Sequence, residues 1–183
     1  MSARPELVVR QAAAADAAAI AGIYNQGIAD RVATFETRPR DAAEVAGWLG
    51  HVRYPLLVAT AEGAVLGWVR AYPYRERDCY AGIAEFSVYV DRTARGRGVG
   101  DALMRSFVPA CERVGLWKLL SRIFPENAGS RALCMRHDFR EVGVYRRHAR
   151  LDGEWRDVVI VERLIPENLM GSAASKPASP QDA

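Results

Sequence analysis

The chain of 183 residues has little cysteine, histidine or lysine, and no long hydrophobic run. Three cysteines without a C-x-x-C pair, together with three histidines, indicate neither a disulfide framework nor a zinc site. No apolar run approaches the ~20 residues of a membrane span. The N-terminal segment also lacks the pattern of a cleavable signal. We therefore expect a cytoplasmic protein with no bound metal and no association with a membrane.

Positive charge comes almost entirely from arginine, because lysine occurs only at Lys118 and Lys176. The arginine fork suits carboxylate and phosphate oxygens, although an Ala- and Arg-rich chain can also reflect a bias in nucleotide composition. The formal net charge is only +3, without a concentrated basic face, so a nucleic-acid partner is not expected. Hydrophobic residues make up 50% and charged residues 26%, which is typical of a soluble globular domain.

Hydrophobic periodicity predicts helices alternating with strands in the second half of the chain and hairpins on either side. We expect strands at 7–10, 55–60, 64–72, 83–90, 117–123, 141–150 and 155–164, and helices at 16–28, 41–51, 99–114 and 127–137. This order predicts an α/β protein with a mixed sheet covered by helices. From Pro166 the composition turns to Ser, Ala and Pro, so we expect one domain at 1–165 and a flexible tail at 166–183.

The turn Arg95–Gly100 is the most informative segment of the sequence. It follows a strong strand and immediately precedes an amphipathic helix. Its glycines can adopt positive φ and let a ligand approach the backbone. The free N–H groups at the helix start then favour an anion. The spacing fits neither G-x-G-x-x-G nor G-x-x-x-x-G-K-[ST]. The turn therefore predicts an oligophosphate site of another kind.

The turn reads Arg-x-x-Gly-x-Gly, which resembles the pyrophosphate-binding signature of the GCN5-related N-acetyltransferase (GNAT) family. The strand before it, the helix after it, the strand from Trp117 and the helix opened by Asn127 recur in that family. The segments 20–39, 75–90, Pro125-Glu-Asn-Ala and Asp152-Gly-Glu-Trp-Arg-Asp resemble the phosphinothricin acetyltransferase branch, most closely its arsinothricin-acetylating members. The resemblance covers roughly residues 7–165.

This resemblance implies a GNAT fold, with a central, mostly antiparallel, twisted sheet flanked by helices. It also implies transfer of an acetyl group from acetyl-CoA to the α-amine of a glutamate-like antimetabolite, a role in resistance, and a homodimer. The pantetheine arm would bind the backbone of the splayed strand end, and the phosphates would lie over the turn. The cofactor-binding residues predicted in this way are Val88, Tyr89, Val90, Arg95, Gly96, Arg97, Gly98, Val99, Gly100 and Asn127.

Acetyl transfer to an amine requires a base, because amino-acid amines are mostly protonated at pH 7. Glu85 matches the position of the family's catalytic glutamate and could take the proton directly or through water. It could instead be a glutamate on the polar side of a half-exposed strand. Asn127 could anchor the pantetheine arm or the following helix, or simply be an N-cap.

Cys134 lies where many members of the family carry a tyrosine that protonates the leaving thiolate, and where phosphinothricin enzymes carry histidine. A thiol could donate that proton, since the ordinary pKa of cysteine is about 8.5. Three alternatives remain open. Cys134 could be a small buried hydrophobic residue, it could accept the acetyl group covalently, or CoA could leave as a thiolate.

The substrate is expected to contact a loop just before the Glu85 strand. Arginine forks hold carboxylate, phosphinate or arsonate oxygens in pairs, and aromatic rings would form the walls. The predicted substrate-binding residues are Phe35, Tyr74, Arg75, Arg77 and Tyr80. Each could also be an ordinary solvated loop residue. The same scaffold could acetylate another small amine, a polyamine or a protein N-terminus, or bind CoA without turnover.

Overall fold

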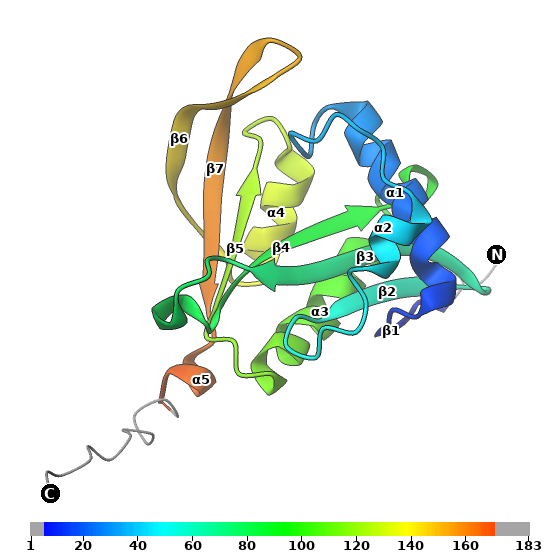
Figure 1. The fold of residues 1–183 in the computed structure, drawn as a ribbon, viewed down its shortest axis with the longest axis horizontal. Coiled ribbons are helices and arrows are strands. Elements are labelled where there is room, and N and C mark those ends of the chain that lie inside the picture. The colour runs from blue at the N-terminus through cyan, green and yellow to red at the C-terminus, as the bar shows by residue number, and fades with distance from the viewer. Residues whose placement is uncertain (1–5, 171–183) are drawn as a thin grey trace, which may run out of the picture.

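A computed structural model describes residues 6–170 of the chain. The described chain folds around one seven-stranded sheet with the order β1-β2-β3-β4-β5-β7-β6 (Figure 1). The strands are β1 (Val8–Gln11), β2 (Leu56–Ala61), β3 (Ala64–Pro73), β4 (Ile83–Val90), β5 (Lys118–Ile123), β6 (Arg140–Leu151) and β7 (Glu154–Leu164). The helices are α1 (Ala17–Asp30), α2 (Ala42–Ala46), α3 (Val99–Arg113), α4 (Ala128–Arg136) and α5 (Pro166–Met170).

Neighbouring strands are antiparallel except β4 and β5, which are parallel. The connection between these two strands contains α3, as expected for a parallel crossover. The predicted α/β class and mostly antiparallel mixed sheet are therefore confirmed. Within residues 6–170, no helix combines the length and the apolar character that crossing a membrane requires.

Helices cover both faces of the sheet, and the alternation of side chains along β2 shows the two layers. Leu56 and Val58 pack in a cluster with α1 and α2, whereas Leu57 and Ala59 pack in a larger cluster with α3 and α4. Successive side chains of a strand point to opposite faces, so β2 is buried on both sides. The core is thus split by the sheet into two apolar layers.

The structure differs from the sequence prediction at the end of the second helix and at the start of the predicted tail. The second helix was expected at 41–51 but ends at Ala46, because Gly47 is a poor helix former and Trp48 and Leu49 continue in tighter turns with i→i−3 hydrogen bonds. Residues 166–170, expected as tail, form α5, with proline at its favoured first position. The rest of the predicted tail lies outside the described residues.

Strands β4 and β5 separate soon after they begin, as Figure 1 shows. Their ladder joins only Ile83–Glu85 to Lys118–Leu120. Just beyond it, Ser121 Oγ donates to the Phe86 carbonyl at 3.0 Å, so the backbone of Phe86 faces β5. Because a strand has a period of two, the backbone groups of Val88 and Val90 also face β5. They lie beyond the last ladder pair and therefore border an open gap.

Candidate active site

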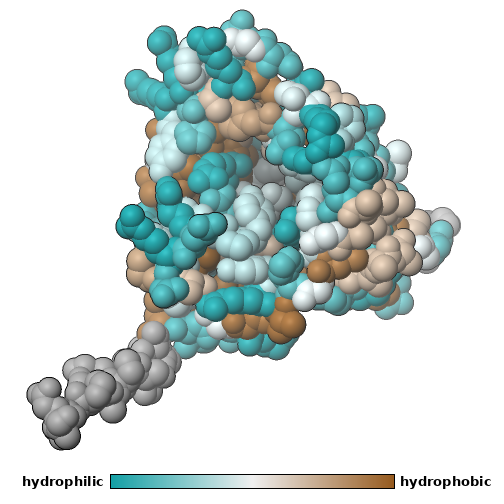
Figure 2. Space-filling view, in the orientation of Figure 1, coloured by the Kyte–Doolittle hydropathy of each residue, from teal (hydrophilic) through white to brown (hydrophobic). Residues whose placement is uncertain are grey.

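Three connected cavities surround the gap between β4 and β5. The large cavity, about 560 Å³, lies over the sheet beside α1 and α2. The turn cavity, about 300 Å³, lies beside the start of α3 and the N-terminal end of α4. A passage of about 40 Å³ lies between β4, β5 and α4, and Ala33 and Tyr89 line all three spaces. Figure 2 shows the corresponding hollow near the middle of this face, with many hydrophilic residues around it.

The glycine turn has the backbone geometry that an anion site requires. Gly96 and Gly98 have φ of 73° and 85°, and a Cβ added at either would meet no atom within 4 Å. The backbone at these positions therefore faces open space. No side chain caps the start of α3, so its first N–H groups are free for a ligand. Together with the unpaired edge of β4, this geometry fits an extended ligand that carries phosphates.

Arg95, the first residue of the turn, is held from two sides. Arg95 donates from Nε to the Val90 carbonyl at 3.4 Å and from Nη2 to the Asp30 carboxylate at 2.9 Å. Asp30, at the end of α1, also pairs with Arg92 at 2.5 Å. The two arginines beside the turn therefore share one carboxylate.

The predicted cofactor-binding residues divide into two groups in the structure. Those that line the turn cavity are Val88, Tyr89, Val90, Arg95, Gly98, Gly100 and Asn127. Gly96 and Arg97 are exposed on the turn but do not line the turn cavity. The side chain of Val99 is buried in the core. For Val99, only the backbone N–H is therefore available to a ligand.

Asn127 caps α4, as one of the sequence interpretations predicted. Its Oδ1 accepts from the Ser130 N–H at 3.1 Å, and its Nδ2 donates to the Val32 carbonyl at 3.1 Å. The second bond ties the loop after α1 to the start of α4 across the gap. Asn127 also lines the passage and the turn cavity, so the cap lies directly at the site.

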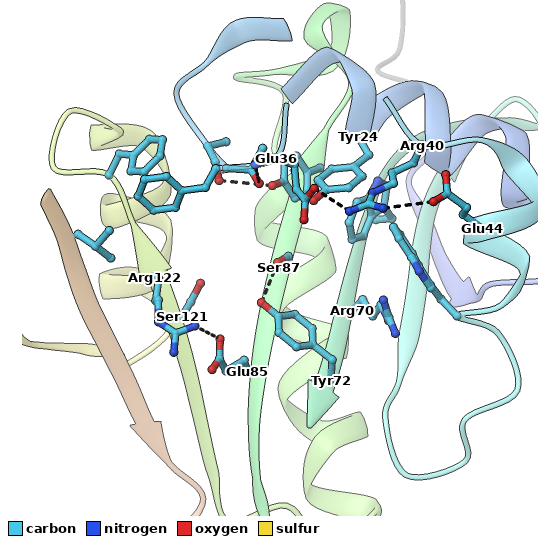
Figure 3. Close-up of a pocket in the computed structure, with 18 residues that line it drawn as sticks. Tyr24, Glu36, Arg40, Glu44, Arg70, Tyr72, Glu85, Ser87, Ser121 and Arg122 are labelled. Carbon is cyan, nitrogen blue, oxygen red and sulfur yellow. Dashed lines mark hydrogen bonds and ion pairs between the residues drawn. The ribbon is translucent and has the colours of Figure 1, made fainter. Parts of the chain in front are cut away.

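Glu85 is a buried carboxylate and not a glutamate on a half-exposed strand. Its exposed fraction is 6%, and it lines the large cavity. Arg122 Nη1 lies 2.5 Å from its Oε2 (Figure 3). Burial raises the pKa of Glu85 above its ordinary value, while the charges of Arg122 and, more weakly, Arg75 lower it in part. A carboxyl with a raised pKa is a better proton acceptor, so this environment suits a general base.

Cys134 lines the passage, but its surroundings favour the neutral thiol. Its exposed fraction is 1%, and it belongs to the larger apolar cluster. Burial raises the pKa of the thiol to about 12. Such a thiol is a weak acid and rarely ionises to a nucleophilic thiolate. This burial agrees with the small hydrophobic residue among the alternatives for Cys134, and its roles as general acid or acetyl acceptor stay predictions.

We expect Cys134→Ala to retain near-normal turnover. The substitution removes one buried sulfur and should lower the free energy of unfolding by about 1 kcal/mol, without touching the group that accepts the proton. Steady-state kinetics and thermal unfolding would measure the two effects. A loss of kcat by more than tenfold in a folded variant would instead restore the acid or covalent role.

The three aromatic residues among the predicted substrate-binding residues line two cavities beside Glu85. Phe35 lines the large cavity, edge-on to Phe124 at a centroid distance of 4.8 Å. Tyr74 and Tyr80 line a fourth cavity of about 260 Å³, which shares Glu85 and Arg122 with the large cavity. These three aromatic residues therefore stand on both sides of the Glu85–Arg122 pair.

The two predicted arginines lie outside these cavities. Arg75 and Arg77 are exposed, and neither lines a described cavity. The guanidinium of Arg75 lies over the ring of Tyr74 at 5.1 Å. The charge of Arg75 still reaches Glu85, whose pKa it lowers. The loop thus places Arg75 near Glu85 but at the surface.

Sequence reasoning missed most of the polar lining of the large cavity. The missed residues are Tyr24, Glu36, Arg40, Glu44, Trp48, Arg70, Tyr72, Ser87, Ser121 and Arg122. The period of two along β3 places Trp68, Arg70 and Tyr72 on one face, but only strand pairing shows that this face meets Glu85. No local pattern marks Arg122, which reaches Glu85 from β5.

Comparison with known proteins shows the family of this chain. The model of the acetyltransferase (GNAT) family matches residues 21–139. The chain belongs to the GNAT family. It is an N-acetyltransferase that uses acetyl-CoA, so a module that binds CoA without turnover is excluded. Among residues 6–170, no cluster of three or more His, Cys, Asp or Glu residues could hold a metal ion.

Relatives of this GNAT chain include named N-acetyltransferases. It is 35% identical over 164 residues to a phosphinothricin N-acetyltransferase of Streptomyces coelicolor, covering 86% of this chain and 96% of the relative. It is 30% identical to an L-methionine sulfoximine/L-methionine sulfone acetyltransferase of Pseudomonas aeruginosa, covering 84% and 92%. A phosphinothricin acetyltransferase from Sinorhizobium meliloti, solved in complex with acetyl-CoA, is 31% identical with a TM-score of 0.82, covering 95% and 94%.

Proposed function

We propose that this enzyme acetylates the α-amine of a glutamate-like amino-acid antimetabolite, such as phosphinothricin, methionine sulfoximine or arsinothricin, and thereby confers resistance. The buried Glu85 is the observation that carries this proposal, because its carboxylate lines both the large cavity and the fourth cavity next to the point where β4 and β5 separate, and would act there as the base. The relatives that acetylate phosphinothricin and methionine sulfoximine support the substrate class.

Different residues around the gap bind acetyl-CoA and accept the proton of the amine. When bound, acetyl-CoA supplies a thioester carbonyl to the amine. The turn Arg95–Gly100 holds its phosphates, and the backbone of Val88 and Val90 holds its extended arm. The Val88 N–H donates to the carbonyl oxygen as charge develops there. Glu85 accepts one proton from the ammonium group, directly or through water, and the neutral amine then attacks the carbonyl. The C–N bond forms as the C–S bond breaks, and the second proton of the nitrogen passes to the leaving sulfur directly or through water, so that CoA leaves as the thiol.

The substrate occupies the large cavity with its amine toward Glu85. Phe35 forms one wall, and its edge-on contact with Phe124 keeps that wall rigid. Tyr74 and Tyr80 form the wall beyond the Glu85–Arg122 pair, with Arg75 and Arg77 at the surface beside it. Holding the amine and the carbonyl in one orientation lowers the barrier without further chemistry.

A substrate panel tests the proposal. Purified protein is mixed with acetyl-CoA and with phosphinothricin, arsinothricin, L-methionine sulfoximine, L-methionine sulfone, glutamate or a polyamine, and thiol release is followed. We expect turnover of the glutamate-like compounds well above that of the polyamine, because each glutamate that lines the cavity already pairs with an arginine and offers little to a second cation. Background rates with every glutamate-like compound, alongside turnover of another amine, would replace the proposed substrate class.

We propose that two copies of the chain associate through β6 and β7. Valine and aromatic side chains of this hairpin are about half exposed: Val142 49%, Val144 51%, Tyr145 53% and Trp155 50%. Val142 and Tyr145 also line the fourth cavity with Glu85, so a second copy would close that cavity. Sedimentation equilibrium would distinguish a dimer from a monomer.

The cytoplasmic location stays a prediction from the sequence.

A further inference from the structure

Arg70 lies on the same face of the sheet as Glu85. The register of β3 and β4 pairs Tyr72 with Glu85 and Arg70 with Ser87. Arg70 is therefore the diagonal neighbour of Glu85, and such neighbours lie about 7–8 Å apart. Figure 3 shows Tyr72 between them, with its hydroxyl directed to Ser87. Arg70 and Glu85 thus reach the large cavity from two separate places.

Arg70 differs from the other two arginines that line the large cavity. Arg40 pairs with Glu36 at 2.7 Å and with Glu44 at 3.2 Å. Arg122 pairs with Glu85 at 2.5 Å. Among the described residues, Arg70 makes no ion pair and no side-chain hydrogen bond. It is therefore the arginine of this cavity whose charge no carboxylate of the described chain balances.

Aromatic rings hold the Arg70 guanidinium in place. Its Cζ lies 4.6 Å from the centroid of the Trp48 ring and 5.9 Å from that of Tyr72. Stacking of this kind covers the flat face of the guanidinium but leaves its N–H groups at the edge free. A preorganised fork loses less entropy when it binds a ligand, so this arrangement suits recognition of an oxyanion.

The surroundings of Arg70 also disfavour its charge in the absence of an anion. Burial lowers the pKa of Arg70, and only tyrosines offset that effect. A partly buried cation without a partner costs free energy, which an anionic ligand would recover. The cavity is thus prepared for a negative group at a site separate from Glu85.

We propose that Arg70 binds the oxyanion at the far end of the substrate and sets the preference of the enzyme for acidic over neutral side chains. This inference rests on the proposed function, in which the amine lies at Glu85. The α-carboxylate is bonded to the same carbon as the amine and so stays near Glu85 and Arg122. The group that reaches Arg70, on the other side of Tyr72, is therefore the distal one. Phosphinate or carboxylate oxygens fit the fork, and a neutral sulfone satisfies it less well.

Replacing Arg70 tests the inference with two substrates that differ in distal charge. Phosphinothricin carries an anionic phosphinate, and L-methionine sulfone carries a neutral sulfone. We expect Arg70→Met, which retains an apolar chain over Trp48, to lower kcat/KM for phosphinothricin by about 10- to 100-fold. The effect on L-methionine sulfone should be no more than about threefold, so the selectivity between the two should collapse. The KM for acetyl-CoA should not change.

Two further variants separate recognition from folding. Arg70→Lys keeps the charge but loses the fork, and it should recover part of the phosphinothricin activity. Arg105→Met removes an exposed arginine of α3, whose ion pair with Asp101 spans 2.9 Å, and should leave both substrates unaffected. Equal losses on both substrates in Arg70→Met, or no loss on either, would overturn the inference while leaving the proposed function intact.

A binding measurement covers the case in which turnover fails. Calorimetric titration of phosphinothricin into the wild-type protein with CoA should show binding that Arg70→Met weakens by the same 10- to 100-fold. If the wild type binds phosphinothricin through Arg70 but acetylates neither compound, the proposed function and the role of Arg70 in substrate preference are wrong, and only its binding of the oxyanion stands. If the wild type neither binds nor acetylates it, both are wrong.

Discussion

Glu85→Gln should lower kcat by roughly 10²- to 10⁴-fold, the range expected when a general base is removed. Glutamine has nearly the same shape and can still meet Arg122, but it cannot accept a proton from the amine. Glu36 and Glu44 also line the large cavity, but both pair with Arg40, whereas Glu85 is the buried carboxylate beside β5. Steady-state rates with saturating acetyl-CoA and amine would measure the effect.

The pH profile adds a second readout. Because burial raises the pKa of Glu85, wild-type activity should fall as the pH is lowered through a value above the ordinary carboxyl range. The variant should lack this limb, and its deficit should shrink at high pH, where the amine loses its proton to solvent. Glu141→Gln removes a carboxylate that pairs with Arg131 at 2.7 Å and lines none of the described cavities, so it should keep the wild-type profile. A Glu85→Gln enzyme with an unchanged profile would disprove the role of base.

Gly98→Ala should raise the KM for acetyl-CoA by about tenfold or more. The φ of Gly98 is 85°, so alanine there strains the backbone by about 1–2 kcal/mol and tilts the N–H groups that begin α3. The new methyl group would also stand in the open space beside the turn, where the phosphates are proposed to bind. The rate at saturating acetyl-CoA should fall much less than kcat/KM.

Gly115→Ala is the matched control for this strain. Gly115 has φ of 80° after the end of α3, and a Cβ there also meets no atom within 4 Å. Both variants should lose a similar free energy of unfolding, measured by denaturant titration. Only Gly98→Ala should raise the KM for acetyl-CoA. Equal KM values in the two variants would mean that the turn does not hold the phosphates.

Much of the fold follows from local sequence because hydrophobic periodicity and turn residues act over short distances. The strand Ile83–Val90 is found with the predicted bounds, and the Asp152-Gly153 turn joins β6 to β7 as expected. The helix ends were less predictable. Gly47 ends α2 early, and Asn168 of α5 donates from Nδ2 to the distant carbonyls of Glu112 and Leu116.

The site could be predicted only where a motif marks it. The glycine turn fixes its own backbone geometry, and Glu85 lies at a set distance before it. The polar lining of the large cavity comes instead from the meeting of β3, β4, β5 and the loop after α1. Arg70 and Arg122 acquire their surroundings through strand register and side-chain packing between segments far apart in the chain. No local pattern contains that information.

The narrow passage between β4 and β5 has a consequence for the course of the reaction. Its volume of about 40 Å³ is the smallest of the three cavities that meet at the gap. In the proposed reaction the acetyl group lies at this passage, between an amine in the large cavity and the rest of acetyl-CoA beside the turn. The two proposed ligands would thus occupy different cavities and would meet only when both are bound. On the proposed function we therefore expect kinetics of a ternary complex that forms in either order, with no acetylated form of the protein between two half-reactions.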